Sequence, residues 1–133
     1  MEQTRARFPF ESFPEGWFVV AFSTEIAPGE VKTVHYFGTD LVLFRTADGA
    51  LTATDPHCPH LGAHLGDGTV KDGCLRCPFH DWAFDTKGQC VDVPYAPKIP
   101  PKAKLRTWPL VEQNGVVLVH YSARGRAPAW TPS

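Results

Sequence analysis

The stretch "CPHLGAHLGDGTVKDGCLRCPFH" (58–80) holds three of the chain's four cysteines and three of its six histidines. Cys58 and His60 are separated by one residue, Cys77 and His80 by two, and 16 residues lie between His60 and Cys77. A proline follows each of these two cysteines, and four glycines lie between the pairs. Prolines and glycines at these places favour two tight loops. We expect the loops to bring four metal-binding side chains together at one end of a sheet.

A set of two cysteines and two histidines suits either zinc or a [2Fe–2S] cluster in which one iron takes two thiolates and the other two imidazoles. Zinc fingers generally keep like ligands paired, whereas each loop here supplies one cysteine and one histidine. Each loop can therefore give one ligand to each iron, which favours the cluster. The main alternative is a zinc site that uses the Cys-x2-Cys spacing, with Cys58, His60, Cys74 and Cys77 as ligands.

The other histidines and cysteines are expected to have supporting roles. His57 and His64 flank His60, but only His60 has the one-residue spacing from its cysteine. Cys74 and Cys90 lie in strand patterns, so we expect small core residues there rather than a disulfide. The remaining side chains expected to pack or to face solvent are His35, His120, Trp17, Trp82 and Trp108.

Length and composition limit the classes of function. A chain of 133 residues is long enough for one domain with a modest core. Thirteen basic against 14 acidic side chains, without a basic stripe, argue against nucleic acid as a partner. The apolar runs "WFVVAF" (17–22) and "VVLV" (116–119) are far shorter than the roughly 20 residues of a membrane-spanning helix, and the start "MEQTRARFPF" lacks the apolar region of a signal peptide. We therefore expect no membrane partner, a cytoplasmic location, and cysteines that bind metal.

The pattern of residues predicts an all-β protein. Thirteen prolines and 11 glycines separate short β-type segments, and no window repeats apolar residues with a helical period. We expect the first three or four strands to form a meander and Asn114-Gly115 to form a hairpin turn. A single domain is expected over residues 1–121, with a cluster-binding part at about 55–90 and an irregular tail at 122–133. The expected strands lie at 16–23, 31–38, 40–46, 50–55, 90–95 and on both sides of the turn within 105–121.

The segments "CPHLGAHL" and "CPFHDWAFD" resemble the two cluster-binding boxes of Rieske proteins, and the order of segments is similar from about Phe8 to His120. The stretch "FPEGWFVVAFSTEIAPGEVKTVHYFGTDLVLFRTADGAL" more narrowly resembles the N-terminal Rieske domain of terminal non-haem iron oxygenases, particularly ketosteroid hydroxylases and cholesterol desaturases. The resemblance implies a Rieske-type antiparallel β sandwich with a two-loop cluster-binding subdomain.

The resemblance also implies the roles of the four ligands to the [2Fe–2S] cluster. Cys58 and Cys77 would bind the buried iron, and His60 and His80 the outer iron near solvent. The chain departs from the family at Asp81, where the second box usually has glycine. A collar of Leu61, Pro78 and Phe79, with His64 and Asp81 at its rim, would surround the outer histidines.

High-potential Rieske proteins differ from this chain in both boxes. They carry an extra cysteine in each loop, joined as a disulfide, where this chain has Ala63 and Phe79. Their second box has hydroxyl residues that donate to cluster sulfur, where this chain has Trp82 and Phe84. Fewer donors stabilise the reduced cluster less, so we expect a potential on the order of −150 mV, at the bottom of the Rieske range.

The resemblance implies one-electron transfer within an oxygenase system. The electron would come from a flavin-containing reductase or a ferredoxin and would pass to an oxygenase catalytic domain. Oxygen activation there needs a mononuclear iron held by two histidines and a carboxylate, and only His120 follows His80 in this chain. The chain is therefore either a Rieske ferredoxin or the Rieske portion of a larger enzyme. The alternative function is a zinc-stabilised, non-redox interaction module.

Overall fold

The computed structural model describes residues 14–59, 62–79, 81–94, 99 and 103–132 and confirms the all-β class. No α-helix occurs in these residues, and the described part of the chain holds no helix long and apolar enough to cross a bilayer. The 3-10 turns are η1 (Ser23–Glu25) and η2 (Leu65–Asp67). The strands are β1 (Gly16–Phe22), β2 (Val31–Tyr36), β3 (Thr39–Arg45), β4 (Leu51–Thr54), β5 (Thr69–Lys71), β6 (Cys74–Arg76), β7 (Ala83–Phe84), β8 (Cys90–Asp92), β9 (Thr107–Trp108), β10 (Leu110–Gln113) and β11 (Val116–Tyr121).

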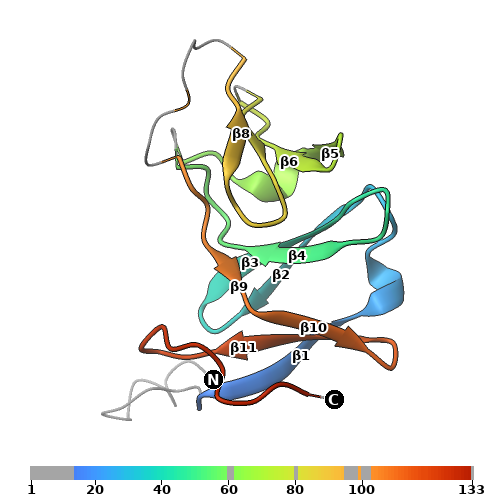
Figure 1. Cartoon of the computed structure of the whole chain (residues 1–133), viewed down its shortest axis with the longest axis vertical. Helices are drawn as coiled ribbons and strands as arrows, with labels where there is room; N and C mark the ends of the chain where they lie inside the picture. The colour runs from blue at the N-terminus through green and yellow to red at the C-terminus, as the bar shows by residue number, and fades with distance from the viewer. Residues whose placement is uncertain (1–13, 60–61, 80, 95–98, 100–102, 133) are drawn as a thin grey trace.

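The strands form three sheets, in the orders β1-β11-β10, β2-β3-β4-β9 and β5-β6-β7-β8, and the pairing is antiparallel throughout. Figure 1 shows the β5–β8 sheet at one end of the long axis, the β1-β11-β10 sheet at the other, and the β2-β3-β4-β9 sheet between them. The β1-β11-β10 sheet and the β2-β3-β4-β9 sheet pack together as a sandwich around one core. The β5–β8 sheet covers a second core at the opposite face of the middle sheet.

Strand β3 separates the two cores. Its side chains alternate between the two faces of the sheet, as in any strand. Leu41 and Leu43 belong to the core shared with β1 and β11, whereas Val42 and Phe44 belong to the core beneath the β5–β8 sheet. All four are completely buried. The continuous apolar run "LVLF" thus reflects burial on both faces, and β3 connects the sandwich to the end that carries the cysteines.

A two-residue turn closes one hairpin in each of the three sheets. Asn114 and Gly115 join β10 to β11 and have φ of 53° and 80°, which confirms the predicted hairpin. Positive φ at both positions is the geometry whose twist suits a two-residue hairpin. The ranges 37–38 and 72–73 form the same kind of turn between β2 and β3 and between β5 and β6, each with glycine second.

The predicted meander is wrong for the first strand. β2, β3 and β4 follow one another as antiparallel neighbours, but β1 pairs with β11 at the far end of the chain. The run 105–113 also divides at Pro109: β9 pairs with β4, and β10 pairs with β11. Since proline has no N–H for a ladder, the chain changes sheets there. Segments that are distant in sequence therefore close the sandwich.

Candidate metal centre

The first predicted metal-binding loop, residues 58–63 (loop 1), begins at a buried cysteine. The N–H of Cys58 donates to the carbonyl of Ala63 at 2.9 Å, and the N–H of Gly62 donates to the carbonyl of Cys58 at 2.9 Å. Gly62 has a φ of 79°, in the left-handed region that glycine adopts readily. The backbone bonds therefore fix both ends of the loop around the cysteine.

The second loop, residues 77–82 (loop 2), repeats this construction. The N–H of Cys77 donates to the carbonyl of Trp82 at 2.8 Å, and the N–H of Asp81 donates to the carbonyl of Cys77 at 3.1 Å. Asp81 has a φ of 62°, so it adopts the left-handed conformation that Gly62 has in loop 1. Aspartate is among the few residues other than glycine that visit this region, which explains how it stands where the family pattern has glycine.

The sulfur-bearing residues of the two loops share one apolar environment. Cys58 is 2% exposed and Cys77 is 4% exposed, and both belong to the core beneath the β5–β8 sheet. Neither is in a disulfide. The other buried members of this core are Val42, Phe44, Ala63, Leu65, Leu75, Trp82, Phe84, Cys90, Val93, Ala103 and Leu105. The loops thus direct two potential thiolate ligands into a single water-poor region.

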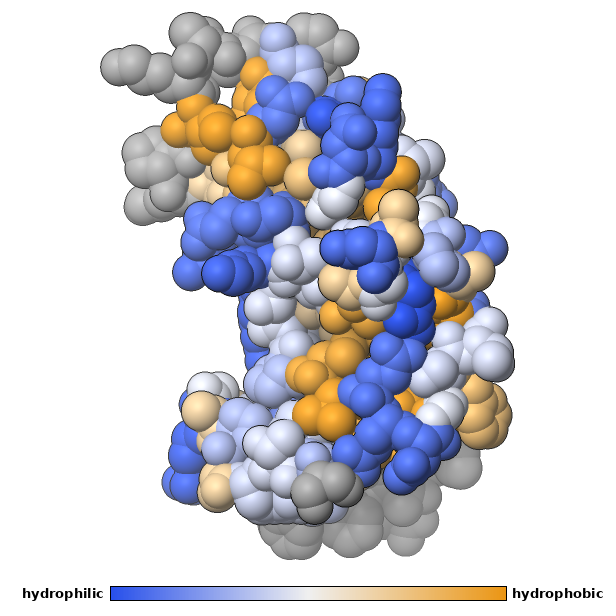
Figure 2. Space-filling model, turned by 45° about the vertical axis from the view of Figure 1, so that its right-hand side comes forward, coloured by the Kyte–Doolittle hydropathy of each residue, from blue (hydrophilic) through white to orange (hydrophobic). Residues whose placement is uncertain are grey.

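The predicted histidine ligands, His60 and His80, lie outside the described residues, as does Leu61 of the predicted collar. The described neighbours of these residues are exposed, with Phe79 at 65%. Figure 2 shows apolar surface at the end of the molecule formed by the β5–β8 sheet. In each loop a buried cysteine is therefore followed directly by an exposed proline, Pro59 or Pro78.

Cys74 and Cys90 do not share the position of the two loop cysteines. Cys74 begins β6 and alternates with Leu75, which belongs to the core, so its side chain lies on the opposite face of the strand. Burial raises the pKa of the Cys74 thiol, and the charge of Asp85 adds to the effect. Burial likewise raises the pKa of Cys90. Neither is in a disulfide, and Cys90 is a buried core residue, as predicted. The prediction of a core position is wrong for Cys74, which is only half-buried.

His64 ties loop 1 to the sandwich through Asp40, a residue that sequence reasoning did not select. His64 Nδ1 accepts the N–H of Gly66 at 3.0 Å, so the proton is on Nε2, which donates to Asp40 Oδ2 at 2.9 Å. His35 Nδ1 donates to the other oxygen of Asp40 at 2.9 Å. Both hydrogen bonds lower the pKa of the Asp40 carboxyl, and the bond from His35 has the larger effect. His57 is exposed, and its ring makes a T-shaped contact with that of His64 at a centroid distance of 5.5 Å.

A signal for Asp40 existed in the sequence. In a two-residue hairpin turn at 37–38, residue 35 pairs with residue 40, and His35 does pair with Asp40. His120, predicted either to pack or to face solvent, is 4% exposed, and its ring forms a T-shaped contact with Trp17 at a centroid distance of 5.3 Å. Trp108 is 6% exposed and lies in the sandwich core, as expected for a packing residue.

A comparison with known families decides what these loops are. Residues 16–109 match the family model described as the Rieske [2Fe-2S] domain. The chain belongs to the Rieske family. The matched range includes both loops and both buried cysteines, and the cofactor of this Rieske domain is a [2Fe–2S] cluster. The zinc alternative finds no support in this match, because the family that matches binds a [2Fe–2S] cluster.

Curated relatives place this Rieske domain among oxygenase components. It is 43% identical over 125 residues to a cholesterol 7-desaturase of Hemicentrotus pulcherrimus, a match that covers 90% of this chain and 27% of the desaturase. It is 39% identical over 120 residues to a probable 3-ketosteroid-9-alpha-monooxygenase, oxygenase component, of Rhodococcus rhodochrous, which covers 90% of this chain and 30% of that protein. The chain thus spans less than a third of the length of these relatives.

Solved structures confirm the Rieske-type fold. The crystal structure of apo dicamba monooxygenase superposes with a TM-score of 0.74 and 31% identity, covering 89% of this chain and 37% of that one. NdmA of Pseudomonas putida CBB5, solved with caffeine, gives the same score and identity over 81% of this chain and 33% of that one. Both therefore contain, as about a third of their length, the arrangement of sheets described above.

The residues of the two loops fit a Rieske cluster. Such a cluster takes thiolates on one iron and imidazoles on the other, and it needs the sulfur side shielded from water. Cys58 and Cys77 would supply the thiolates, since they begin two loops that have the same pattern of backbone hydrogen bonds. The apolar core around them, including Trp82 and Phe84, supplies the shielding.

Proposed function

We propose that the chain carries out one-electron transfer in a non-haem iron oxygenase system, taking electrons from a reductase and passing them to a mononuclear iron site on a catalytic domain. The observation that carries this proposal is the pair of loops with equal backbone bonding, which direct Cys58 and Cys77 into one apolar core within a Rieske domain. When bound, the [2Fe–2S] cluster supplies a centre that accepts and releases one electron.

Within this proposal the ligands are Cys58 and Cys77 on the inner iron and His60 and His80 on the outer iron. The burial of both cysteines and the left-handed residues that close both loops support the assignment. The roles of the chain's own residues are then to hold the thiolates in fixed loops, to keep water from the sulfur side, and to set the potential.

A low potential suits electron delivery to an oxygen-activating iron. The two positions with hydroxyl donors in high-potential members are here Trp82, 7% exposed, and the fully buried Phe84. Removing hydrogen bonds to sulfur makes an added electron less favourable, which lowers the potential. We propose that it lies near the bottom of the Rieske range.

The electron-transfer surface is proposed to include Pro78 and Phe79, which are exposed next to the buried Cys77. An apolar surface of this kind suits the small interfaces of redox encounters, below about 1,200 Å² in total, where fast release matters. The donor would be a flavin-containing reductase or a ferredoxin in the cytoplasm. The acceptor would be an oxygenase catalytic domain, on the same polypeptide or a separate one.

The domain boundaries proposed are residues 1–121 for one Rieske domain, with a cluster-binding subdomain at about 55–90, and an irregular tail at 122–133. The β5–β8 sheet, from 69 to 92, supports the separate subdomain. The relatives that act on sterols and ketosteroids favour a steroid as the substrate of the complete system.

Stopped-flow reduction tests this function directly. The purified chain, mixed without oxygen with a flavin-containing reductase and reduced nicotinamide cofactor, should lose its visible charge-transfer bands, and added one-electron oxidant should restore them. With reductant, oxygen and a steroid but no catalytic domain, it should form no product. Product formation by this chain alone, or a chain that no reductant bleaches, would overturn the proposal.

A further inference from the structure

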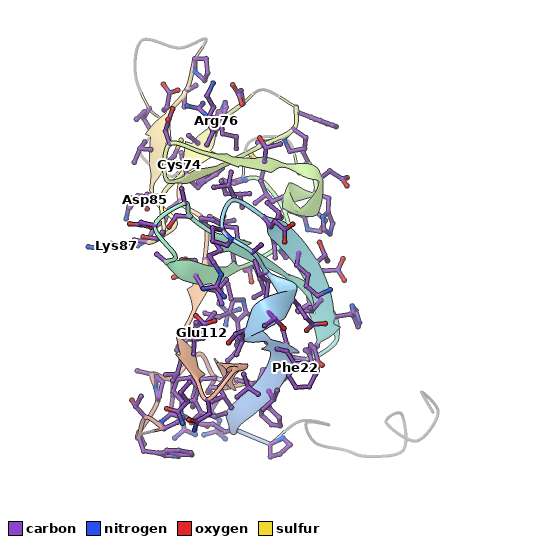
Figure 3. The ribbon with its side chains drawn as sticks, turned by 90° about the vertical axis from the view of Figure 1, so that its right-hand side faces the viewer. Phe22, Cys74, Arg76, Asp85, Lys87 and Glu112 are labelled. Carbon is purple, nitrogen blue, oxygen red and sulfur yellow. The ribbon has the colours of Figure 1, made fainter. Side chains whose placement is uncertain are left out.

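An arginine joins the end of loop 2 to the neighbouring strand. Arg76 is the last residue of β6 and directly precedes Cys77. Its Nη1 donates to the backbone oxygen of Asp81 at 2.8 Å and to Oδ2 of Asp92, in β8, at 3.1 Å. The side chain of Arg76 is 16% exposed, and Figure 3 shows it within the β5–β8 end of the molecule, near Cys74. The guanidinium of Arg76, directly before loop 2, is therefore bonded both to Asp81 near the end of this loop and to Asp92 in β8.

The carbonyl that Arg76 binds belongs to a residue whose conformation is costly. Asp81 has a φ of 62°, and its counterpart in loop 1 is Gly62. A residue with a Cβ is less stable in the left-handed region than glycine, because the Cβ approaches the following carbonyl. Loop 2 thus carries a backbone cost that loop 1 lacks, and the bond from Arg76 to the Asp81 carbonyl offsets it.

The charge of Arg76 also lies beside the loop. Its Nη1 is 3.6 Å from the carboxylate of Asp81, besides the 3.1 Å bond to Asp92. Its Nε is buried and has no hydrogen-bond partner among the residues described. A cation with little access to water acts strongly on nearby charge, because solvent screens it less. This guanidinium would therefore favour the added electron of a reduced cluster.

We propose that Arg76 is a positioning residue for the [2Fe–2S] cluster: it holds loop 2 in the conformation that presents its ligands, and its charge raises the reduction potential. This inference rests on the proposed function, since it requires that loop 2 bind the cluster. Arg76 thus has two effects, one on how firmly the cluster is held and one on its reduction potential. Different substitutions separate these effects.

Four variants separate the two effects. Arg76→Gln removes the positive charge and the hydrogen bonds to both Asp81 and Asp92. Arg76→Lys keeps the charge but replaces the planar guanidinium with a single ammonium on a shorter side chain. Asp92→Asn removes one negative charge near Arg76. Arg45→Lys is the matched control, because Arg45 is a similarly buried arginine, with a side chain 10% exposed, that pairs with Glu112 of β10 in the sandwich. The readouts are the rate of cluster loss to a chelator, followed by visible absorbance, and the midpoint potential by voltammetry at one pH.

Arg76→Gln should lose the cluster about tenfold faster than the wild type, because removing a residue that supports metal ligands typically weakens metal binding by at least about that factor. Its reduction potential should also be lower, because a positive charge is lost. Arg76→Lys should lose the cluster faster while its potential stays close to that of the wild type. Asp92→Asn should raise the potential, opposite in sign to Arg76→Gln. Arg45→Lys should change neither readout. A purely structural role would not give opposite shifts in potential.

The variant Asp81→Gly tests the conformational part. In this background the left-handed residue costs less, so Arg76→Lys should speed cluster loss by a smaller factor than in the wild type. An unchanged potential in Arg76→Gln, or cluster loss in Arg76→Lys no faster than in Arg45→Lys, would overturn the inference. A wild-type protein with no iron and sulfide would instead overturn the proposed function, so the two failures are distinguishable.

Discussion

Gly62 and Asp81 occupy equivalent places in the two loops: each has a positive φ, 79° and 62°, and each donates its N–H to the carbonyl of the cysteine four residues earlier. Among the described residues other than its chain neighbours, no atom lies within 4 Å of the position that a Cβ on Gly62 would take. A substitution there would therefore act through backbone conformation, without a steric clash.

Replacing Gly62 with alanine should destabilise the protein by about 1–2 kcal/mol, the usual cost of a left-handed residue with a Cβ. Gly73, in the turn between β5 and β6, has a φ of 77° and equal free space, so Gly73→Ala should cost a similar amount. Urea unfolding without oxygen measures both. Only Gly62→Ala should also speed cluster loss to a chelator. Equal cluster loss in the two variants would show that loop 1 does not need this conformation.

Asp40 fixes the orientation of the His64 ring, and through it the start of η2. Replacing Asp40 with alanine should free the ring to rotate, so that Gly66 loses the acceptor of its N–H. Hydrogen exchange of the Gly66 amide should then become faster. His35→Ala removes the other histidine bound to Asp40 and leaves the His64 bond, so it is the control and should leave the Gly66 amide unchanged. The same exchange rate in both variants would show that Asp40 does not hold the His64 ring in place for the Gly66 amide.

The ion pair between Arg45 and Glu112 links the middle sheet to β10. Arg45 Nη2 donates to Glu112 Oε2 at 2.6 Å, and this bond lowers the pKa of the Glu112 carboxyl and raises that of Arg45. Figure 3 shows Glu112 at the sandwich end, away from Arg76. Glu112→Gln should cost about 1–3 kcal/mol of stability at neutral pH, because a charged hydrogen bond is lost.

The pH dependence of this pair has a definite sign. Because the folded pKa of Glu112 is depressed, its contribution is complete above the ordinary pKa of 4.5 and is lost as the pH falls through the lower folded value. The difference in melting temperature between the wild type and Glu112→Gln should therefore shrink as the pH falls below about 4.5. A difference that stayed constant over this range would show that the carboxylate does not contribute through its charge.

Phe79 is proposed to contact the redox partners. Replacing it with aspartate should slow electron transfer from the reductase and leave the visible spectrum unchanged, because the side chain is 65% exposed and is not a ligand. Phe22, 62% exposed at the sandwich end, provides the control. Figure 3 shows it far from the β5–β8 sheet, so Phe22→Asp should not affect the rate. Stopped-flow traces of equal rate for the two variants would exclude a role of Phe79 in docking.

The sequence predicted local features well because their causes are local. Asn114-Gly115 requires positive φ at two successive residues, and the alternating strands on both sides complete the hairpin signal. The proline after each loop cysteine, together with the nearby glycines, predicted two tight loops, and Cys58 and Cys77 do begin loops with the same backbone hydrogen bonds. Cys90 likewise could be expected in the core, because it opens a strand of β-type residues, and it is 7% exposed.

Features that depend on tertiary contacts escaped prediction. β1 pairs with β11, almost a hundred residues later, and no local pattern distinguishes this pairing from a meander. The role of Arg76 depends on the approach of β8 to loop 2, which a sequence does not display. Asp40 is intermediate, because correct placement of the turn at 37–38 would have paired it with His35.

The central claim is that two cysteines and two histidines of these loops hold a Rieske cluster. Protein labelled with ¹⁵N only in histidine, reduced with dithionite and measured by pulsed EPR, tests it most directly, because imidazole nitrogen bound to iron couples strongly to the unpaired electron. The account predicts two strongly coupled ¹⁵N nuclei in the wild type, one after His60→Ala or His80→Ala wherever a cluster is retained, and equal amounts of iron and sulfide. A colourless, folded protein with one zinc ion, or a reduced cluster with no coupled histidine nitrogen, would contradict it.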